Sequence, residues 1–184
     1  MLKNVIPECY IDTCLINVLL RADAGSRGVN HGKGNSAAAK KMQEKFYDAF
    51  SLGIIDKDKR EIDYLKKFLL INDTIKDFSL LYKHKEKHHY FIQLCPESEN
   101  WICNVSGEIG IDLLGMHKLP TTPSLLAEYT KDVESKTDYR FIRLFKDIVR
   151  QSEEINFEPV LKMRHWLRIL VDNNYQADIN ELMK

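Results

Sequence analysis

The stretch "SLGIIDKDKR", residues 51–60, decides the fold class, because a short apolar run ends in two acidic residues. The run Ser51–Asp56 predicts a buried strand. Alternation along extended backbone directs Asp56 and Asp58 to the same side of the chain. Two carboxylates at this spacing repel each other unless a cation lies between them, and Mg²⁺ (or Mn²⁺) prefers such oxygen ligands. An isolated Asp-x-Asp is also common in solvated turns, so that alternative stays open.

The residues before this strand alternate between strand and helix signals. Strands are expected at Val5–Ile11 and Arg27–His31, and helices at Thr13–Arg21, with Asp12 or Thr13 as its N-cap, and at 36–50, capped by Asn35 or Ser36. This alternation predicts an α/β fold with a parallel sheet and right-handed crossovers.

The residues after Arg60 predict a different organisation. The segment 61–70 (EIDYLKKFLL) is expected to be helical, and Phe78–Lys83 and His88–Cys95 are expected to form a hairpin or neighbouring strands. From Glu99 onward the pattern is helical. We therefore expect a core over residues 1–103, and a helical C-terminal extension over residues 104–184 that packs on it.

Composition limits the possible functions. The chain has 27 basic and 27 acidic residues, so a large overall positive field for nucleic acid is absent, although a local basic patch is not excluded. Four cysteines without paired spacing make a zinc site or a disulfide framework unexpected and fit a reducing cytoplasm. No apolar run approaches the ~18 residues of a membrane helix, so we expect a cytoplasmic protein without a membrane partner.

Acidic residues recur where predicted strands end. Glu8 lies in the first strand, Asp56 and Asp58 close another, and Glu97 and Glu99 follow His88–Cys95. In a parallel sheet the carboxyl ends of the strands face one crevice, which is where function gathers. Burying Glu8 among apolar residues without a role would be costly.

These residues resemble the motifs of the Toprim domain, which topoisomerases, bacterial primases and nucleases of the overcoming-lysogenisation-defect type share. The family has a strand-end Glu, usually followed by Gly and with an Asp a few residues on; here Cys9 follows Glu8, and Asp12 lies four positions after it. Its second motif, a strand-end Asp-x-Asp, matches Asp56 and Asp58. The stretch "CPESENWI" is similar to an element of small Toprim-like bacterial defence proteins, with Glu99 as an acidic candidate and Trp101 as a packing residue.

The resemblance implies a magnesium-dependent nuclease or phosphotransferase acting on DNA or RNA. Asp56 and Asp58 would bind the metal, Glu8 would be a ligand or general base, and Glu99 would be a further ligand. Lys33 in "HGKGNS" is a candidate to stabilise charge on the phosphate, although a purely geometric role for this turn is equally open. Lys57, Lys59 and Arg60 are nearer in sequence to the aspartates.

Three further interpretations remain open. Proteins of this kind often work beside an ATPase, and this chain has no G-x-x-x-x-G-K-[ST] loop, so we expect an ATPase partner or a homodimer. The main alternative is a non-catalytic Toprim-like interaction module in a larger complex. A phosphatase of the haloacid dehalogenase type ranks last, because Lys59 follows the second Asp and the strand is not the first in the chain.

Most histidines have no marked chemical partner in the sequence; for His31, which lies beside the expected crevice, a simple loop position is favoured over a role in acid–base chemistry. The segment "HKEKHH", residues 84–89, reads as a solvated hairpin tip rather than a metal site. The segment "KMRHWLRIL" predicts an amphipathic core helix rather than a nucleic-acid-binding helix.

Overall fold

The computed structural model describes residues 2–20, 34–57 and 62–184 as five strands and a set of helices. The strands are β1 (Val5–Pro7), β2 (Ser51–Asp56), β3 (Phe68–Asn72), β4 (Ser79–His84) and β5 (His89–Leu94). The α-helices are α1 (Tyr10–Leu19), α2 (Asn35–Lys40), α3 (Ser98–Glu108), α4 (Leu113–His117), α5 (Pro123–Thr130), α6 (Tyr139–Ile155), α7 (Glu158–Asn173) and α8 (Ile179–Met183). Short helical segments are η1 (Lys41–Lys45, a π turn), η2 (Leu65–Lys67), η3 (Val133–Lys136) and η4 (Asn174–Gln176).

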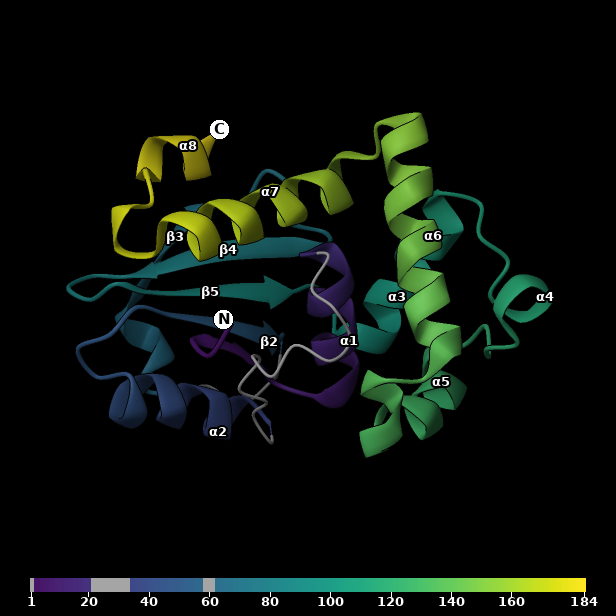
Figure 1. Ribbon diagram of the computed structural model, residues 1–184, viewed down its shortest axis with the longest axis horizontal. Helices are drawn as coiled ribbons and strands as arrows, with labels where there is room; N and C mark the ends of the chain where they lie inside the picture. Colours follow the sequence, from purple (N-terminus) through teal and green to yellow (C-terminus); the bar gives the residue numbers. More distant parts are fainter. Residues whose placement is uncertain (1, 21–33, 58–61) are drawn as a thin grey trace.

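The sheet is mixed, with the strand order β1-β2-β5-β4-β3 (Figure 1). Strands β1, β2 and β5 run parallel, whereas β4 is antiparallel to both β5 and β3. The expected α/β class is therefore confirmed, as are strand β2 with its predicted bounds and the antiparallel hairpin of β4 and β5. The expected strand Arg27–His31 falls outside the described residues.

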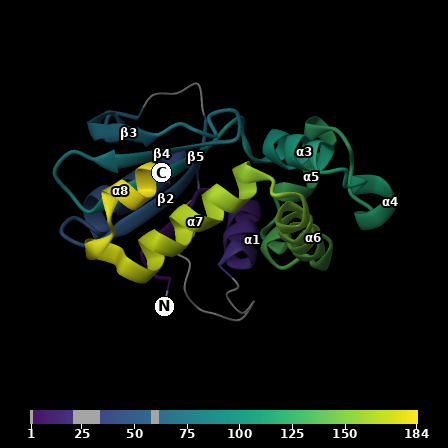
Figure 2. The same ribbon diagram turned by 90° about the horizontal axis from the view of Figure 1, so that it is seen from above.

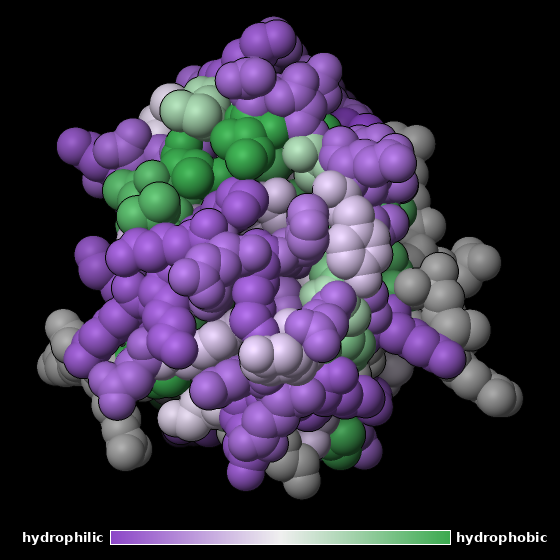
Figure 3. All heavy atoms as spheres, turned by 90° about the vertical axis from the view of Figure 1, so that its left-hand side faces the viewer, coloured by the Kyte–Doolittle hydropathy of each residue, from purple (hydrophilic) through white to green (hydrophobic). Residues whose placement is uncertain are grey.

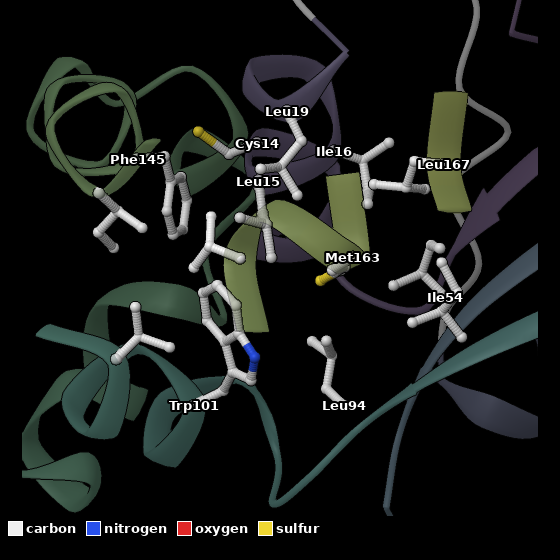
Figure 4. Close-up of a cluster of buried hydrophobic side chains, with 14 of the residues drawn as sticks. Cys14, Leu15, Ile16, Leu19, Ile54, Leu94, Trp101, Phe145, Met163 and Leu167 are labelled. Carbon is white, nitrogen blue, oxygen red and sulfur yellow. The ribbon is translucent and has the colours of Figure 1, made fainter. Parts of the chain in front are cut away.

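Helices cover both faces of the sheet. On one face, Ile6, Ile55 and Phe91 pack against Met42 and its neighbours in α2 and η1. On the other face, the larger core joins the strands to α1, α6 and α7 (Figures 1 and 2). Figure 4 shows side chains of this core, in which Trp101 is fully buried near Phe145. Because β2 is covered on both faces, its residues form a continuous apolar run.

One predicted helix is wrong. Residues 61–70 were expected to be helical, but Leu65–Lys67 forms only a short 3₁₀ turn, and β3 begins at Phe68. Strand β3 pairs with β4, while Phe68 packs on Phe91 at a ring-centroid distance of 4.9 Å. Tertiary pairing overrides local helix propensity in such a short apolar run, because the outer edge of β4 needs hydrogen-bond partners.

The first two helices begin at other residues than the sequence suggests. Helix α1 starts at Tyr10 with Cys9 as N-cap, so neither Asp12 nor Thr13 caps it. Instead, Asp12 Oδ2 accepts a hydrogen bond from the Cys9 backbone N–H at 3.1 Å. Helix α2 is capped by Gly34, which adopts φ = 92°, a conformation that favours glycine.

The C-terminal helices lie mainly beyond one end of the sheet. Figure 2 shows α3, α4, α5 and α6 gathered where β5 ends, while α7 crosses the sheet. Helix α7 is amphipathic, as predicted, and buries Met163, Trp166 and Leu167. Within the described residues, none of the helices combines the length and apolar character needed to span a membrane.

Candidate functional site

The carboxyl ends of the three parallel strands bring acidic residues together. Glu8 directly follows β1, and Asp56 is the last residue of β2. Strand β5 is followed by a cis peptide bond between Cys95 and Pro96 and then by α3, whose N-cap is Glu97. Because neighbouring parallel strands end at the same edge, these segments surround one point of the fold.

Glu8 and Asp56 are held together by the backbone. Glu8 Oε2 accepts a hydrogen bond from the Asp56 N–H at 2.8 Å, and the Glu8 N–H donates to the Ile54 carbonyl at 2.8 Å. Asn35 at the start of α2 donates its side-chain N–H to the Asp56 carbonyl at 3.2 Å. The side chain of Glu8 therefore reaches Asp56 at the same edge of the sheet, as the metal-site hypothesis requires.

Ser98 joins two carboxyl groups that are far apart in the sequence. Asp56 Oδ1 accepts hydrogen bonds from Ser98 N–H at 3.1 Å and from Ser98 Oγ at 2.8 Å. The same Oγ lies 2.5 Å from Asp12 Oδ1, and Asp12 is completely buried. The Ser98 hydroxyl has a single hydrogen and can donate it to only one of the two carboxyl groups. The other carboxyl group must then carry a proton of its own to form its hydrogen bond with Ser98 Oγ.

The electrostatics of the site disfavour negative charge. Burial raises the pKa of Asp56 to about 9, and the charges of Asp12 and Glu8 add to this effect. Burial also raises the pKa of Asp12 and of the Cys9 thiol. A bound cation would offset the repulsion among the carboxylates and lower these pKa values again.

An open cavity of about 500 Å³ lies against these residues. It is lined by Glu8, Cys9, Tyr10, Gly34, Asp56, Glu97, Glu99, Thr130 and Lys131. Thr130 at the end of α5 donates a hydrogen bond from its hydroxyl to the Glu99 carboxylate, which ties α5 to the first turn of α3. The C-terminal helices thus form one wall of a cavity whose other walls come from the strand ends.

The structure brings together part of the predicted site. Glu8, Asp56 and Glu99 line the same cavity. Asp58 and Lys33 fall outside the described residues, so their predicted roles remain predictions. Trp101 is a buried packing residue, as the resemblance implied.

Ser98 and Lys131 were not predicted to belong to the site. Asp12 was named in the first motif of the Toprim resemblance, four positions after Glu8, but no role was assigned to it. Nothing in the local sequence marks Ser98 or Lys131, since their proximity to Asp56 and Glu8 depends on how α3 and α5 pack. Lys131 supplies a positive charge from a part of the chain in which no catalytic group was expected.

The residues of the cavity are chemically suited to a divalent metal. Glu8 and Asp56 offer oxygen donors, and Mg²⁺ commonly takes one or two carboxylates and completes its shell with water and phosphate. In the described chain, both hydrogen bonds to the Asp56 carboxylate reach Oδ1, which leaves Oδ2 for a ligand. However, no group of three or more His, Cys, Asp or Glu side chains within the described ranges is arranged to hold a metal.

The histidines among the described residues lie elsewhere, and two of them differ from the prediction. His84 and His89 were expected at a solvated hairpin tip, but both are buried. His89 shares a hydrogen bond of 2.5 Å with the Tyr64 hydroxyl, and its Nε2 lies 2.8 Å from the Phe46 carbonyl. Burial lowers the pKa of both histidines, so they serve as neutral packing residues at the end of the sheet opposite the cavity.

The chain matches no protein-family model, no curated protein and no solved structure.

Proposed function

We propose that this protein is a metal-dependent phosphodiesterase of Toprim type that cleaves nucleic acid with Mg²⁺ or Mn²⁺. The observation that carries this proposal is the convergence of Glu8 and Asp56 from two parallel strand ends on one cavity. Such a pair is unfavourable by itself because burial and like charge both oppose ionisation. A divalent cation that binds there removes this penalty.

The residues of the cavity suggest a division of roles. Asp56 Oδ2 and the Glu8 carboxylate would hold the metal, which supplies an activated water and offsets charge on the phosphate. A carboxylate of the cavity accepts the proton of the attacking water as the new P–O bond forms and the P–O bond to the leaving oxygen breaks. Lys131 would hold a phosphate oxygen, the role that the sequence suggested for Lys33.

The same proposal includes the cellular compartment and the partners of the protein. The four cysteines are free thiols, which suits a reducing cytoplasm. The Toprim resemblance adds an ATPase partner or a second copy of the chain, and a place in bacterial defence. None of these is needed for the metal site itself, so the site can be tested on the isolated protein.

The first experiment measures metal binding by thermal unfolding. At a Mg²⁺ concentration ten times the dissociation constant, binding should stabilise the fold by about 1.4 kcal/mol, or roughly 3–6 °C for a chain of this size. The double variant E8Q/D56N should lose this shift, whereas E108Q, which changes an exposed carboxylate on α3, should keep it. An equal shift in all three proteins would show that the metal binds elsewhere.

The second experiment measures cleavage of labelled DNA and RNA with Mg²⁺ or Mn²⁺. The wild type and E108Q should cut, and E8Q/D56N should not. Cleavage by the double variant at the wild-type rate would disprove the assignment of Glu8 and Asp56.

A second candidate is a non-catalytic interaction module. One observation favours it, because Asp56 and Asp12 already receive hydrogen bonds from Ser98 and Cys9. Carboxyl groups satisfied in this way can stabilise a fold without a metal. This candidate predicts no metal-dependent shift in the wild type and no cleavage of either nucleic acid.

A further inference from the structure

Positive charge is concentrated in three segments of a chain that is neutral as a whole. The segments 40–48, 63–67 and 83–88 contain eight lysines and four carboxylates. Because the complete chain has 27 basic and 27 acidic residues, the remainder carries the matching negative excess. The charges are therefore separated along the molecule and not evenly mixed.

The three segments meet at one end of the sheet, which we call the lysine end. The Lys85 N–H donates to the Lys67 carbonyl at 3.1 Å, which joins the β4–β5 turn to η2. The Lys87 ammonium donates to the Tyr47 carbonyl at 2.8 Å, which joins the same turn to the residues after η1. This is where β2 and β5 begin, so it lies opposite the acidic cavity at their carboxyl ends.

The lysine end presents charge and one exposed aromatic ring, that of Tyr47, to solvent. Figure 3 faces this end of the molecule, and hydrophilic side chains cover most of it. Lys87 lies over the ring of Tyr47, which is 58% exposed, and Lys67 lies over the ring of Tyr64, which is buried. In the described part of the chain, Lys45, Lys67, Lys83, Lys85 and Lys87 form no ion pair with a carboxylate.

We propose that the lysine end binds the phosphate backbone of nucleic acid without regard to sequence. This inference rests on the proposed function, because it makes the lysine end an anchor for the substrate of that cavity. Ammonium groups beside the exposed ring of Tyr47 offer the two contacts that nucleic acid strands accept, phosphate pairing and stacking.

One helical segment connects the acidic cavity to the lysine end. Residue Gly34 lines the cavity, and α2 and η1 run from there to Lys45 at the lysine end. The eleven residues 35–45 rise about 16 Å at ~1.5 Å per residue, which corresponds to roughly five base pairs at ~3.4 Å each. A duplex longer than about five base pairs can contact both the cavity and the lysine end, and a shorter one cannot.

The test is direct binding of a labelled 30-base-pair duplex, followed by fluorescence anisotropy in EDTA so that no metal-dependent cleavage occurs. The variant K45Q/K67Q/K85Q removes three charges from the lysine end. The control K118Q/K146Q/K184Q removes three exposed lysine charges elsewhere, so both proteins have the same net charge. Circular dichroism and thermal unfolding verify that both variants fold.

The lysine-end variant should bind at least ten times more weakly than wild type at low salt. The slope of log K against log salt should fall in magnitude by ~0.9 for each phosphate that a lysine no longer neutralises, or about 2–3 in total. The control should match the wild type.

Equal duplex binding by the two triple variants would overturn the proposal. So would tighter binding of the wild type to phosphatidylserine vesicles than to the duplex, which would assign the lysine end to a membrane surface. Because the duplex assay needs no catalysis, its outcome is independent of the proposed enzyme. If the lysine-end variant loses duplex binding but the wild type never cleaves, only the proposed function is contradicted. If the wild type cleaves but both triple variants bind the duplex equally, only the anchoring role of the lysine end is contradicted.

Discussion

The substitution D56N should change how the stability of this protein depends on pH. Burial, with the charges of Asp12 and Glu8, raises the pKa of Asp56 to about 9, whereas an aspartate in an unfolded chain has a pKa near ~3.9. Between about pH 4 and pH 9, the folded state therefore keeps a proton that the unfolded state has released. The stabilisation from this group is complete below about pH 4 and is lost as the pH rises.

The size of this pH dependence follows from the single proton that the folded state binds and the unfolded state has released. The free energy of unfolding should fall by about 1.4 kcal/mol per pH unit, or roughly 3 kcal/mol between pH 5 and pH 7. An asparagine cannot titrate, and its carbonyl oxygen can still accept the hydrogen bonds from Ser98. The variant D56N should therefore lose less stability than the wild type over this interval.

The assay is urea unfolding in EDTA at pH 5, 6 and 7, followed by the fluorescence of the two buried tryptophans, Trp101 and Trp166. Buried histidines contribute a slope of the opposite sign below about pH 6.5, because burial lowers their pKa; both proteins share it, so the difference between them isolates residue 56. The exposed substitution D63N is the control and should follow the wild type. Parallel pH profiles for wild type and D56N would refute the reasoning.

The remaining predictions concern metal, packing and capping. Mg²⁺ should stabilise the wild type more at pH 8 than at pH 6, since the metal competes with a proton for the site, and a pH-independent thermal shift would contradict this. G53A should lower the free energy of unfolding in urea by about 1–3 kcal/mol, because a Cβ there would lie 3.0 Å from the Met42 sulfur. At Gly107 a Cβ would meet nothing within 4 Å, so G107A should leave the free energy of unfolding unchanged or raise it by up to ~1 kcal/mol. Equal effects of the two substitutions would contradict the packing argument. D138A should cost about 1–2 kcal/mol, because Asp138 accepts the Arg140 N–H at 2.8 Å as the N-cap of α6, and D138N should recover most of it; an unchanged D138A would contradict the capping role.

The sequence by itself determined the elements that have strong local patterns. Strand β2 is covered on both faces and reads as an unbroken apolar run, and α7 is long enough for its apolar stripe to be unambiguous. The carboxyl-end position of Glu8, Asp56 and Glu99 also follows from the sequence, because a parallel arrangement fixes which ends of the strands meet. These features follow from the spacing of apolar residues along the chain and from the order of the strands and helices.

Only the tertiary structure decided the rest. The segment before β3 has a helical pattern, yet β3 forms because the edge of β4 offers backbone hydrogen bonds and Phe91 offers a packing surface. Ser98 meets Asp56 although the two residues are 42 positions apart in the sequence, and Lys131 reaches the cavity from the end of α5. Distances between such residues are set by how helices pack on the sheet, and no local pattern in a single sequence records them.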